Sequence, residues 1–145
     1  MNEQTITVEG LEDVQRRIYA FGNKLGDKVV RSALRKGANL IKRAVQQQVP
    51  VRTGKLRRGF TVARSKIHRG RRPGDAIGVY LALRKGKNAA FYGRFLNDGW
   101  QHGKTKVPGR HFIQKAFDAN KEKAVRMIVD SAEAGATLLA KQEGL

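Results

Sequence analysis

Three histidines and one Asp-Gly pair are the residues of this chain that most resemble parts of a reactive site. His68, His102 and His111 lack the i, i+4 spacing of a zinc-binding helix, and the chain contains no cysteine that could join them. Asp98 precedes Gly99, and Asp-Gly is first of all a turn dipeptide rather than a catalytic acid. We therefore expect no catalytic residue, no metal site and no cofactor.

A phosphate-binding loop is not expected either. Gly103-Lys-Thr-Lys106 places lysine and threonine beside a glycine, but the spacing of a Walker loop, Gly-x-x-x-x-Gly-Lys-(Ser/Thr), is absent. An enzyme would need a clustered acid or base, and the sequence shows none. An enzyme acting on a small-molecule substrate is thus the least favoured class of function.

Basic side chains carry the strongest signal for binding. Arg69, Arg71 and Arg72 follow His68 in a stretch rich in glycine and proline, and a guanidinium group can grip a phosphate or a carboxylate with two hydrogen bonds. Three interpretations stay open for this basic stretch: an exposed turn that its charge keeps soluble, a contact with a neighbouring subunit, or a contact with DNA.

A second basic group is predicted on one face of a long helix. Arg31 and Arg35 lie on this face with four other cations, and the face is either solvated, or lines a channel or groove that sees nucleic acid, or meets an acidic partner. Tyr92 and Trp100, near a glycine-rich stretch, could anchor an interface or fill the core. The other cations of the helix face are Lys28, Lys36, Lys42 and Arg43.

Net charge points to polyanionic surroundings. The 145 residues include 30 Lys and Arg against 12 Asp and Glu, which gives a formal net charge of +18. Between Val14 and Gly74 the only acidic residue is Asp27, so the basic charge is concentrated in the first half. Such a balance favours DNA, RNA or acidic protein surfaces through long-range attraction and counterion release.

The elements that must position these side chains begin with two helical patterns. Leu11, Val14, Ile18 and Phe21 recur at three- and four-residue intervals after Gly10 and predict a first helix. A second helix is predicted from Asp27, as N-cap, to Gln48, with Gly37 on its apolar stripe where a missing side chain admits a close neighbour.

A small antiparallel sheet is predicted next. Pro50, Thr53 and Gly54 form a turn after the helix, and residues 56–67 then alternate as a strand. A basic hairpin connection spans residues 66–75, and the nearly continuous apolar run of residues 76–83 predicts a central strand covered on both faces.

The last part of the chain is predicted to end in a long helix. Residues 89–96 fit a third strand or a short helix equally well, and residues 97–109 form a loop in which Gly99 and Pro108 are turn positions. From Arg110 an apolar stripe indicates a long C-terminal helix that Gly135 bends or ends.

These elements together predict one α+β domain over residues 1–145. It has a long N-terminal helical region, a small antiparallel sheet with an extended basic hairpin loop, and a long C-terminal helix packed on the sheet. Residues 1–9 form a lead-in, and residues 66–75 and 97–109 are expected to be mobile loops.

Three stretches of the sequence resemble one protein family. Residues 49–60 read as a helix ending in Val-Pro followed by x-x-Thr-Gly-x-Leu-x-x-Gly-Phe. Residues 92–100 are similar to a Tyr-x-x-Phe-x-Glu-x-Gly-Thr motif, and residues 107–117 to a Pro-x-(x)-Phe-(Leu/Ile)-x-x-Ala-(Leu/Phe) helix start. Their order and spacing resemble the neck and tail-completion proteins of long-tailed bacteriophages, the minor tail proteins that join head and tail.

The resemblance implies a structural virion subunit that forms a ring at the head–tail junction, through which DNA passes. It further implies a homo-oligomer, a hexamer rather than a dodecamer, that touches neighbouring neck and tail proteins and lies near the genome without sequence-specific contact. Asn97-Asp98 replaces the family's Glu-x and Trp100 replaces its threonine, so a role of that glutamate does not carry over.

The competing hypothesis is a sequence-nonspecific nucleic-acid-binding protein, which the charge supports equally well. Against it, most aromatic residues lie on apolar stripes and are not interleaved with basic ones, as a stacking platform requires. No apolar run could span a bilayer and no cleavable leader begins the chain, so we expect a soluble protein without a membrane partner, assembled in the host cytoplasm into the virion.

Overall fold

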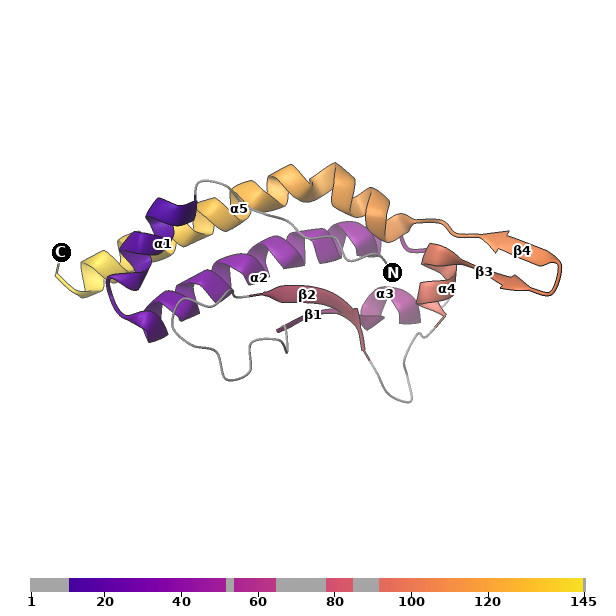
Figure 1. Ribbon diagram of the computed structural model, residues 1–145, viewed down its shortest axis with the longest axis horizontal. Helices are drawn as coiled ribbons and strands as arrows, with labels where there is room; N and C mark the ends of the chain where they lie inside the picture. Colours follow the sequence, from indigo (N-terminus) through magenta and orange to yellow (C-terminus); the bar gives the residue numbers. More distant parts are fainter. Residues whose placement is uncertain (1–10, 52–53, 65–77, 85–91, 145) are drawn as a thin grey trace.

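Two long helices run side by side in opposite directions along the molecule (Figure 1). In this computed structural model, which describes residues 11–51, 54–64, 78–84 and 92–144, they are α2 (Asn23–Gln48) and α5 (Phe112–Gln142). The short helix α1 (Leu11–Tyr19) packs against both of them, at the end of the molecule where α5 finishes. The predicted order of helix, sheet and helix is confirmed.

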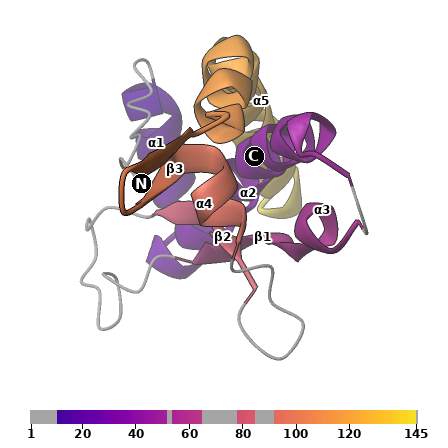
Figure 2. The ribbon, with the colours of Figure 1, turned by 90° about the vertical axis from the view of Figure 1, so that its right-hand side faces the viewer.

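A two-stranded sheet covers the other side of α2, away from α5 (Figures 1 and 2). Strand β1 (Phe60–Arg64) pairs antiparallel with β2 (Val79–Leu83), so that Phe60 faces Leu83 and Arg64 faces Val79 across the ladder. The fold is therefore α+β, as predicted, with α2 as its central layer. Helix α5 meets the sheet at its own first turn, where the Phe112 ring packs edge-on against Phe60 at 6.4 Å, and lies along α2 for the rest of its length.

Apolar side chains fill the molecule in two clusters between these layers. The cluster at the α1 end includes Val14 and Ile18, and both are almost fully buried. The cluster at the opposite end joins α2, α3 (Lys55–Gly59), β1 and the start of α5. Its buried members are Ile41, Val45, Val49, Leu56, Phe60, Phe112, Ala116 and Ala124.

Small residues set the distance between α2 and α5. Alanines recur at intervals of four or eight residues on the buried α5 face, namely Ala116, Ala124, Ala132 and Ala136, and Gly37 faces this row from α2. A methyl group on Gly37 would lie 2.5 Å from Cγ1 of Ile128 and 3.2 Å from the Ala124 carbonyl oxygen. The close neighbour predicted for Gly37 is thus Ile128, and the helix axes approach more closely than large side chains would allow.

This contact predicts that Gly37→Ala has opposite effects on stability in the presence and in the absence of the Ile128 side chain. Gly37→Ala should improve helix propensity by about 1 kcal/mol, but overpacking against Ile128 should cost about 2 kcal/mol, so a net loss of stability is expected. In an Ile128→Ala background the same change should stabilise the protein, because the two atoms closer than 3 Å are gone and only the Ala124 carbonyl oxygen, at 3.2 Å, stays close. Urea unfolding of the four proteins of this double-mutant cycle measures both effects; stabilisation by Gly37→Ala in both backgrounds would contradict the close contact.

The start of α2 differs from the sequence prediction. The helix begins at Asn23, directly after Gly22, so Asp27 lies in its second turn and is not the N-cap. The Asp27 carboxylate instead accepts a hydrogen bond of 2.9 Å from the Tyr19 hydroxyl, which ties α2 to the end of α1. Gly26 lies inside α2 and is buried beneath the Tyr19 ring, where an added methyl group would lie 2.6 Å from Cδ1 of Tyr19.

The chain after α2 also differs. The helix ends at Gln48 and Val49 is extended before Pro50, but Gly54, in the left-handed conformation at φ 71°, starts the short helix α3 rather than a strand. The predicted strand over residues 56–67 is therefore wrong up to Gly59, because Leu56 reaches the core from a helical turn. Thr53 and residues 65–67 lie outside the described residues.

Four further expectations can be compared with the structure. Strand β2 pairs only with β1 among the described residues and leaves Tyr80 exposed, so it is not a central strand covered on both faces. In the undecided stretch of residues 89–96, residues 93–96 belong to a helix, α4 (Gly93–Asp98), and residues 89–91 lie outside the described residues. The predicted loop of residues 97–109 is instead the end of α4 and a hairpin of β3 (Gly99–His102) and β4 (Thr105–Pro108), whose turn holds Gly103 at φ 58°. Helix α5 continues unbroken past Gly135.

Candidate functional site

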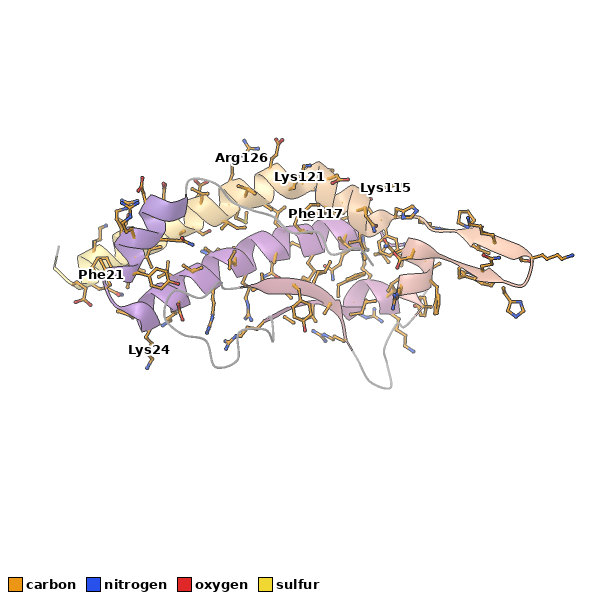
Figure 3. All side chains as sticks on the ribbon, viewed as in Figure 1. Phe21, Lys24, Lys115, Phe117, Lys121 and Arg126 are labelled. Carbon is orange, nitrogen blue, oxygen red and sulfur yellow. The ribbon has the colours of Figure 1, made fainter. Side chains whose placement is uncertain are left out.

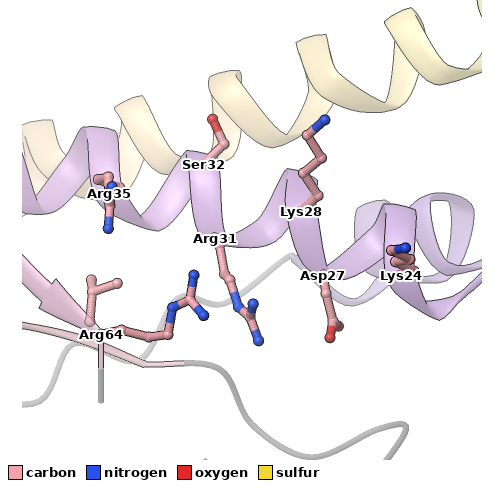
Figure 4. Close-up of a pocket in the computed structure, with 8 residues that line it drawn as sticks. Lys24, Asp27, Lys28, Arg31, Ser32, Arg35 and Arg64 are labelled. Atoms are coloured by element: carbon pink, nitrogen blue, oxygen red, sulfur yellow. The ribbon is translucent and has the colours of Figure 1, made fainter. Parts of the chain in front are cut away.

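A basic groove lies along the first half of α2, beside the end of the β1–β2 sheet (Figure 4). Helix α2 contributes Lys24, Lys28, Arg31 and Arg35, whose spacing of four, three and four residues puts them on one side of the helix. Arg64, the last residue of β1, reaches the same hollow from the sheet. The hollow has a volume of about 490 Å³. The remaining lining residues are Asp27, Ser32 and Val79.

Electrostatics make this groove costly for the isolated protein. Cations at positions i and i+4 on a helix repel each other, and five basic side chains face one carboxylate here. That carboxylate, Asp27, already accepts the hydrogen bond from Tyr19. The Nε atom of Arg31 is buried and has no hydrogen-bond partner in the structure. An anion with several acceptor oxygens would relieve the repulsion among these cations.

The structure divides the basic helix face predicted from the sequence. It brings Arg31 and Arg35 together with Lys28 in the groove, whereas Lys36, Lys42 and Arg43 do not line it. Sequence reasoning missed Lys24, because the helix was predicted to start later, although its four-residue spacing to Lys28 was a usable signal. It also missed Arg64, whose place depends on the register of β1 against β2 and on how the sheet packs on α2.

The β3–β4 hairpin forms an arm that projects from the opposite end of the molecule (Figures 1 and 2). Apart from its base next to α4, the arm is largely solvent-exposed, and its residues Lys104 and Lys106 add positive charge. Trp100, opposite Val107 in the ladder, is 46% exposed. The alternative that Trp100 fills the core is therefore wrong.

Two more aromatic side chains stand exposed where the arm leaves the body. Tyr92 and Phe95 lie three residues apart at the start of α4 and are 36% and 51% exposed. Positions three apart share one side of a helix. An exposed pair of rings next to a projecting hairpin is typical of a surface that binds another protein, because such rings bury large apolar area at low entropic cost.

A buried asparagine fastens the base of the arm to α5. Asn97 is fully buried, and its side-chain oxygen accepts a hydrogen bond of 3.0 Å from the backbone nitrogen of Ile113, in the first turn of α5. Its amide nitrogen donates to the Asp98 carboxylate at 2.7 Å. The backbone nitrogens of Arg110 and His111 donate to the carbonyls of Leu96 and Asn97 at 2.9 Å each. Sequence reasoning noted Asn97 only as a departure from a motif and missed this role.

Two glycines let the backbones cross at the same place. Gly99 ends α4 at φ 84°, a conformation that side chains rarely adopt, so Asp98-Gly99 is a helix-terminating turn. A methyl group on Gly99 or on Gly109 would collide with backbone atoms of the other strand. Pro108 lies in β4 directly opposite Gly99. We call this crossing of residues 97–99 and 109–111 the clamp.

Two of the histidines considered from the sequence are described, and neither lines the groove. His102 lies in β3 and His111 caps α5 in the left-handed conformation at φ 48°, while Arg69, Arg71 and Arg72 lie outside the described residues. Within the described ranges, no group of three His, Cys, Asp or Glu side chains could hold a metal ion. None of the helices in these ranges is both long enough and apolar enough to cross a membrane.

Comparison with known proteins identifies a family. The family model described as "Bacteriophage HK97-gp10, putative tail-component" matches residues 12–99, more than half of the chain. The matched segment runs from α1 to the first residue of β3 and so includes the whole groove, Tyr92 and Asn97. No curated protein and no solved structure matches the chain.

Proposed function

Because the chain belongs to the HK97-gp10-like family of bacteriophage tail components, we propose that this structural tail protein is a neck or tail-completion subunit. In this proposal several copies form a ring at the head–tail junction, and the genome passes through the ring. The subunit has no catalytic activity, and it is assembled in the host cytoplasm before it becomes part of the virion. The observation that carries the proposal is the family match over residues 12–99.

The projecting arm supports ring assembly. A closed ring is built from heterologous contacts, in which one surface of each copy meets a different surface of the next copy. The arm and the exposed rings of α4 lie at one end of an elongated molecule, and the α1 end lies far from them (Figure 1). Each copy thus has two different ends to offer its neighbours, and the resemblance to neck proteins implies a hexamer rather than a dodecamer.

Complementation of a phage that lacks the gene tests the proposal. Without the protein, lysates should contain full heads and finished tails that are not joined, as seen by negative-stain microscopy. The wild-type gene should restore joined, infectious particles. Phe95→Gln with Trp100→Thr should fold normally but reduce the number of joined particles at least tenfold, because both side chains are exposed and only an assembly buries them.

Two exposed apolar residues of α5 provide a matched control. Met127→Gln with Leu138→Gln removes a similar amount of exposed apolar surface far from the arm and should leave joining intact. Joined particles in the absence of the protein would refute the head–tail role. Equal losses from the two double variants would refute the docking role of the arm while leaving the head–tail role standing.

A further inference from the structure

We propose that the basic groove of α2 and Arg64 binds the phosphodiester backbone of duplex DNA without reading its sequence. The proposal assigns a ligand to a site that the family match does not explain, and it does not depend on where in the virion the protein lies. It is carried by the composition of the lining and by its geometry.

The composition of the groove selects an anion of high charge density. Three guanidinium groups and two ammonium groups face the hollow against a single carboxylate. Apolar small molecules are a poor match, because Val79 is the only apolar residue among the described residues of the lining. Arginine presents a planar fork of donors that fits two oxygens of one phosphate, and Arg31, Arg35 and Arg64 supply three such forks.

The geometry of the groove favours a regular polymer. Lys24 and Arg35 are eleven residues apart on α2, a distance of about 16 Å at 1.5 Å per residue. Phosphates recur about every 3.4 Å along the axis of one DNA strand, so the stripe can follow several consecutive phosphates. An acidic protein would have to match this row with carboxylates at the same intervals, whereas any DNA sequence presents the row unchanged.

The residue types of the lining also favour duplex over single-stranded nucleic acid as the ligand. Proteins that hold single strands stack the bases on aromatic side chains, and the part of the lining that the structure describes contains no aromatic residue. A groove lined mainly by cations, with Asp27, Ser32 and Val79 as its other described lining residues, can contact the backbone but offers no ring on which unstacked bases could stack. Duplex DNA, whose bases remain stacked inside, is therefore the ligand that this surface fits.

The salt dependence of binding to a 30-base-pair duplex tests the proposal. Affinity falls as the salt concentration rises, and each phosphate contact makes the slope of log affinity against log salt concentration steeper by about 0.9. A variant with Arg31→Gln, Arg35→Gln and Arg64→Gln should therefore lose about 2.7 from that slope. Fluorescence anisotropy of the labelled duplex across a range of salt concentrations gives the slope directly.

A matched control removes the same charge from the other side of the molecule. Lys115, Lys121 and Arg126 are exposed cations of α5 (Figure 3), and their replacement by glutamine also lowers the net charge by three. The slope of this control should change by less than one. Equal changes in the two triple variants would overturn the proposal, because binding would then follow net charge and not the groove.

Two further measurements keep the test decisive. If the groove triple variant unfolds, as judged by circular dichroism, Arg35→Gln alone serves instead, because this side chain is exposed and its loss should lower the slope by about 0.9. Poly-glutamate and a thirty-residue oligo-dT strand are measured beside the duplex. Groove-dependent binding that favours either of these probes over the duplex would overturn the assignment to duplex DNA.

Discussion

Asn97→Leu is expected to lower the free energy of unfolding by about 3 kcal/mol. The substitution leaves the backbone N–H of Ile113 without its acceptor and the Asp98 carboxylate without its amide donor. A buried polar group that loses its partner costs about 1–3 kcal/mol, and the Ile113 N–H bears most of this cost, because Asp98 is exposed and keeps its ion pair with Arg94. Leucine keeps the branching of asparagine at Cγ and is apolar, so a cavity does not explain the effect.

Urea unfolding of Asn97→Leu beside Asn120→Leu measures this loss. Asn120 lies within α5 and its side chain donates one hydrogen bond of 2.9 Å to the Ala116 carbonyl, which already belongs to the helix. We expect this control to change stability by less than about 1 kcal/mol. A midpoint for Asn97→Leu that stays within the range of the control would show that the side-chain bonds of Asn97 do not hold the arm to α5.

Gly109→Ala is expected to have an effect of similar size for a different reason. The added methyl group would lie 2.5 Å from the Asp98 carbonyl carbon and 2.6 Å from the Gly99 nitrogen, and it would also collide with the Asn97 carbonyl oxygen. These are backbone atoms that cannot rotate away, so the clamp has to open, at a cost of about 3 kcal/mol. Hydrogen exchange should show lost protection of the Arg110 and His111 amides.

Gly103→Ala separates this collision from ordinary glycine strain. Gly103 lies at the tip of the arm at φ 58°, and an added methyl group there would have nothing within 4 Å, so alanine costs only the left-handed conformation, about 1 kcal/mol. Gly109 differs in both respects, since its φ is not in the left-handed range and backbone atoms leave no space for an added methyl group. Equal destabilisation by the two substitutions would contradict the close crossing of the backbones.

Periodicity predicted the long helices well because their apolar faces are continuous. The stripe from Val30 to Val45 and the alanine-rich stripe of α5 both repeat at helical intervals, and the burial pattern follows them. The errors fall where a few residues decide between structures. Leu56 enters the core from one helical turn, whereas a strand was expected there. Strand β2 pairs with β1 alone among the described residues, whereas a central strand was expected. Each of these elements has five residues, which is too short to give a periodic signal.

The candidate site was only half visible in the sequence. Arg31 and Arg35 could be placed on one helix face from spacing alone. Arg64 joins them only because β1 ends beside the first half of α2, which is a property of the tertiary fold. The arm was predicted as a loop because glycines and a proline dominate residues 97–109, yet those same residues are what a tight turn and a close backbone crossing require.

The clamp makes the arm and the longest helix one mechanical unit. Backbone hydrogen bonds from Arg110 and His111, and the side chain of Asn97, all join the root of the hairpin to the first turn of α5. Load applied at the tip consequently passes into a 31-residue rod that reaches the far side of the protein. A partner that binds the tip in an assembled particle thereby fixes the orientation of the whole subunit.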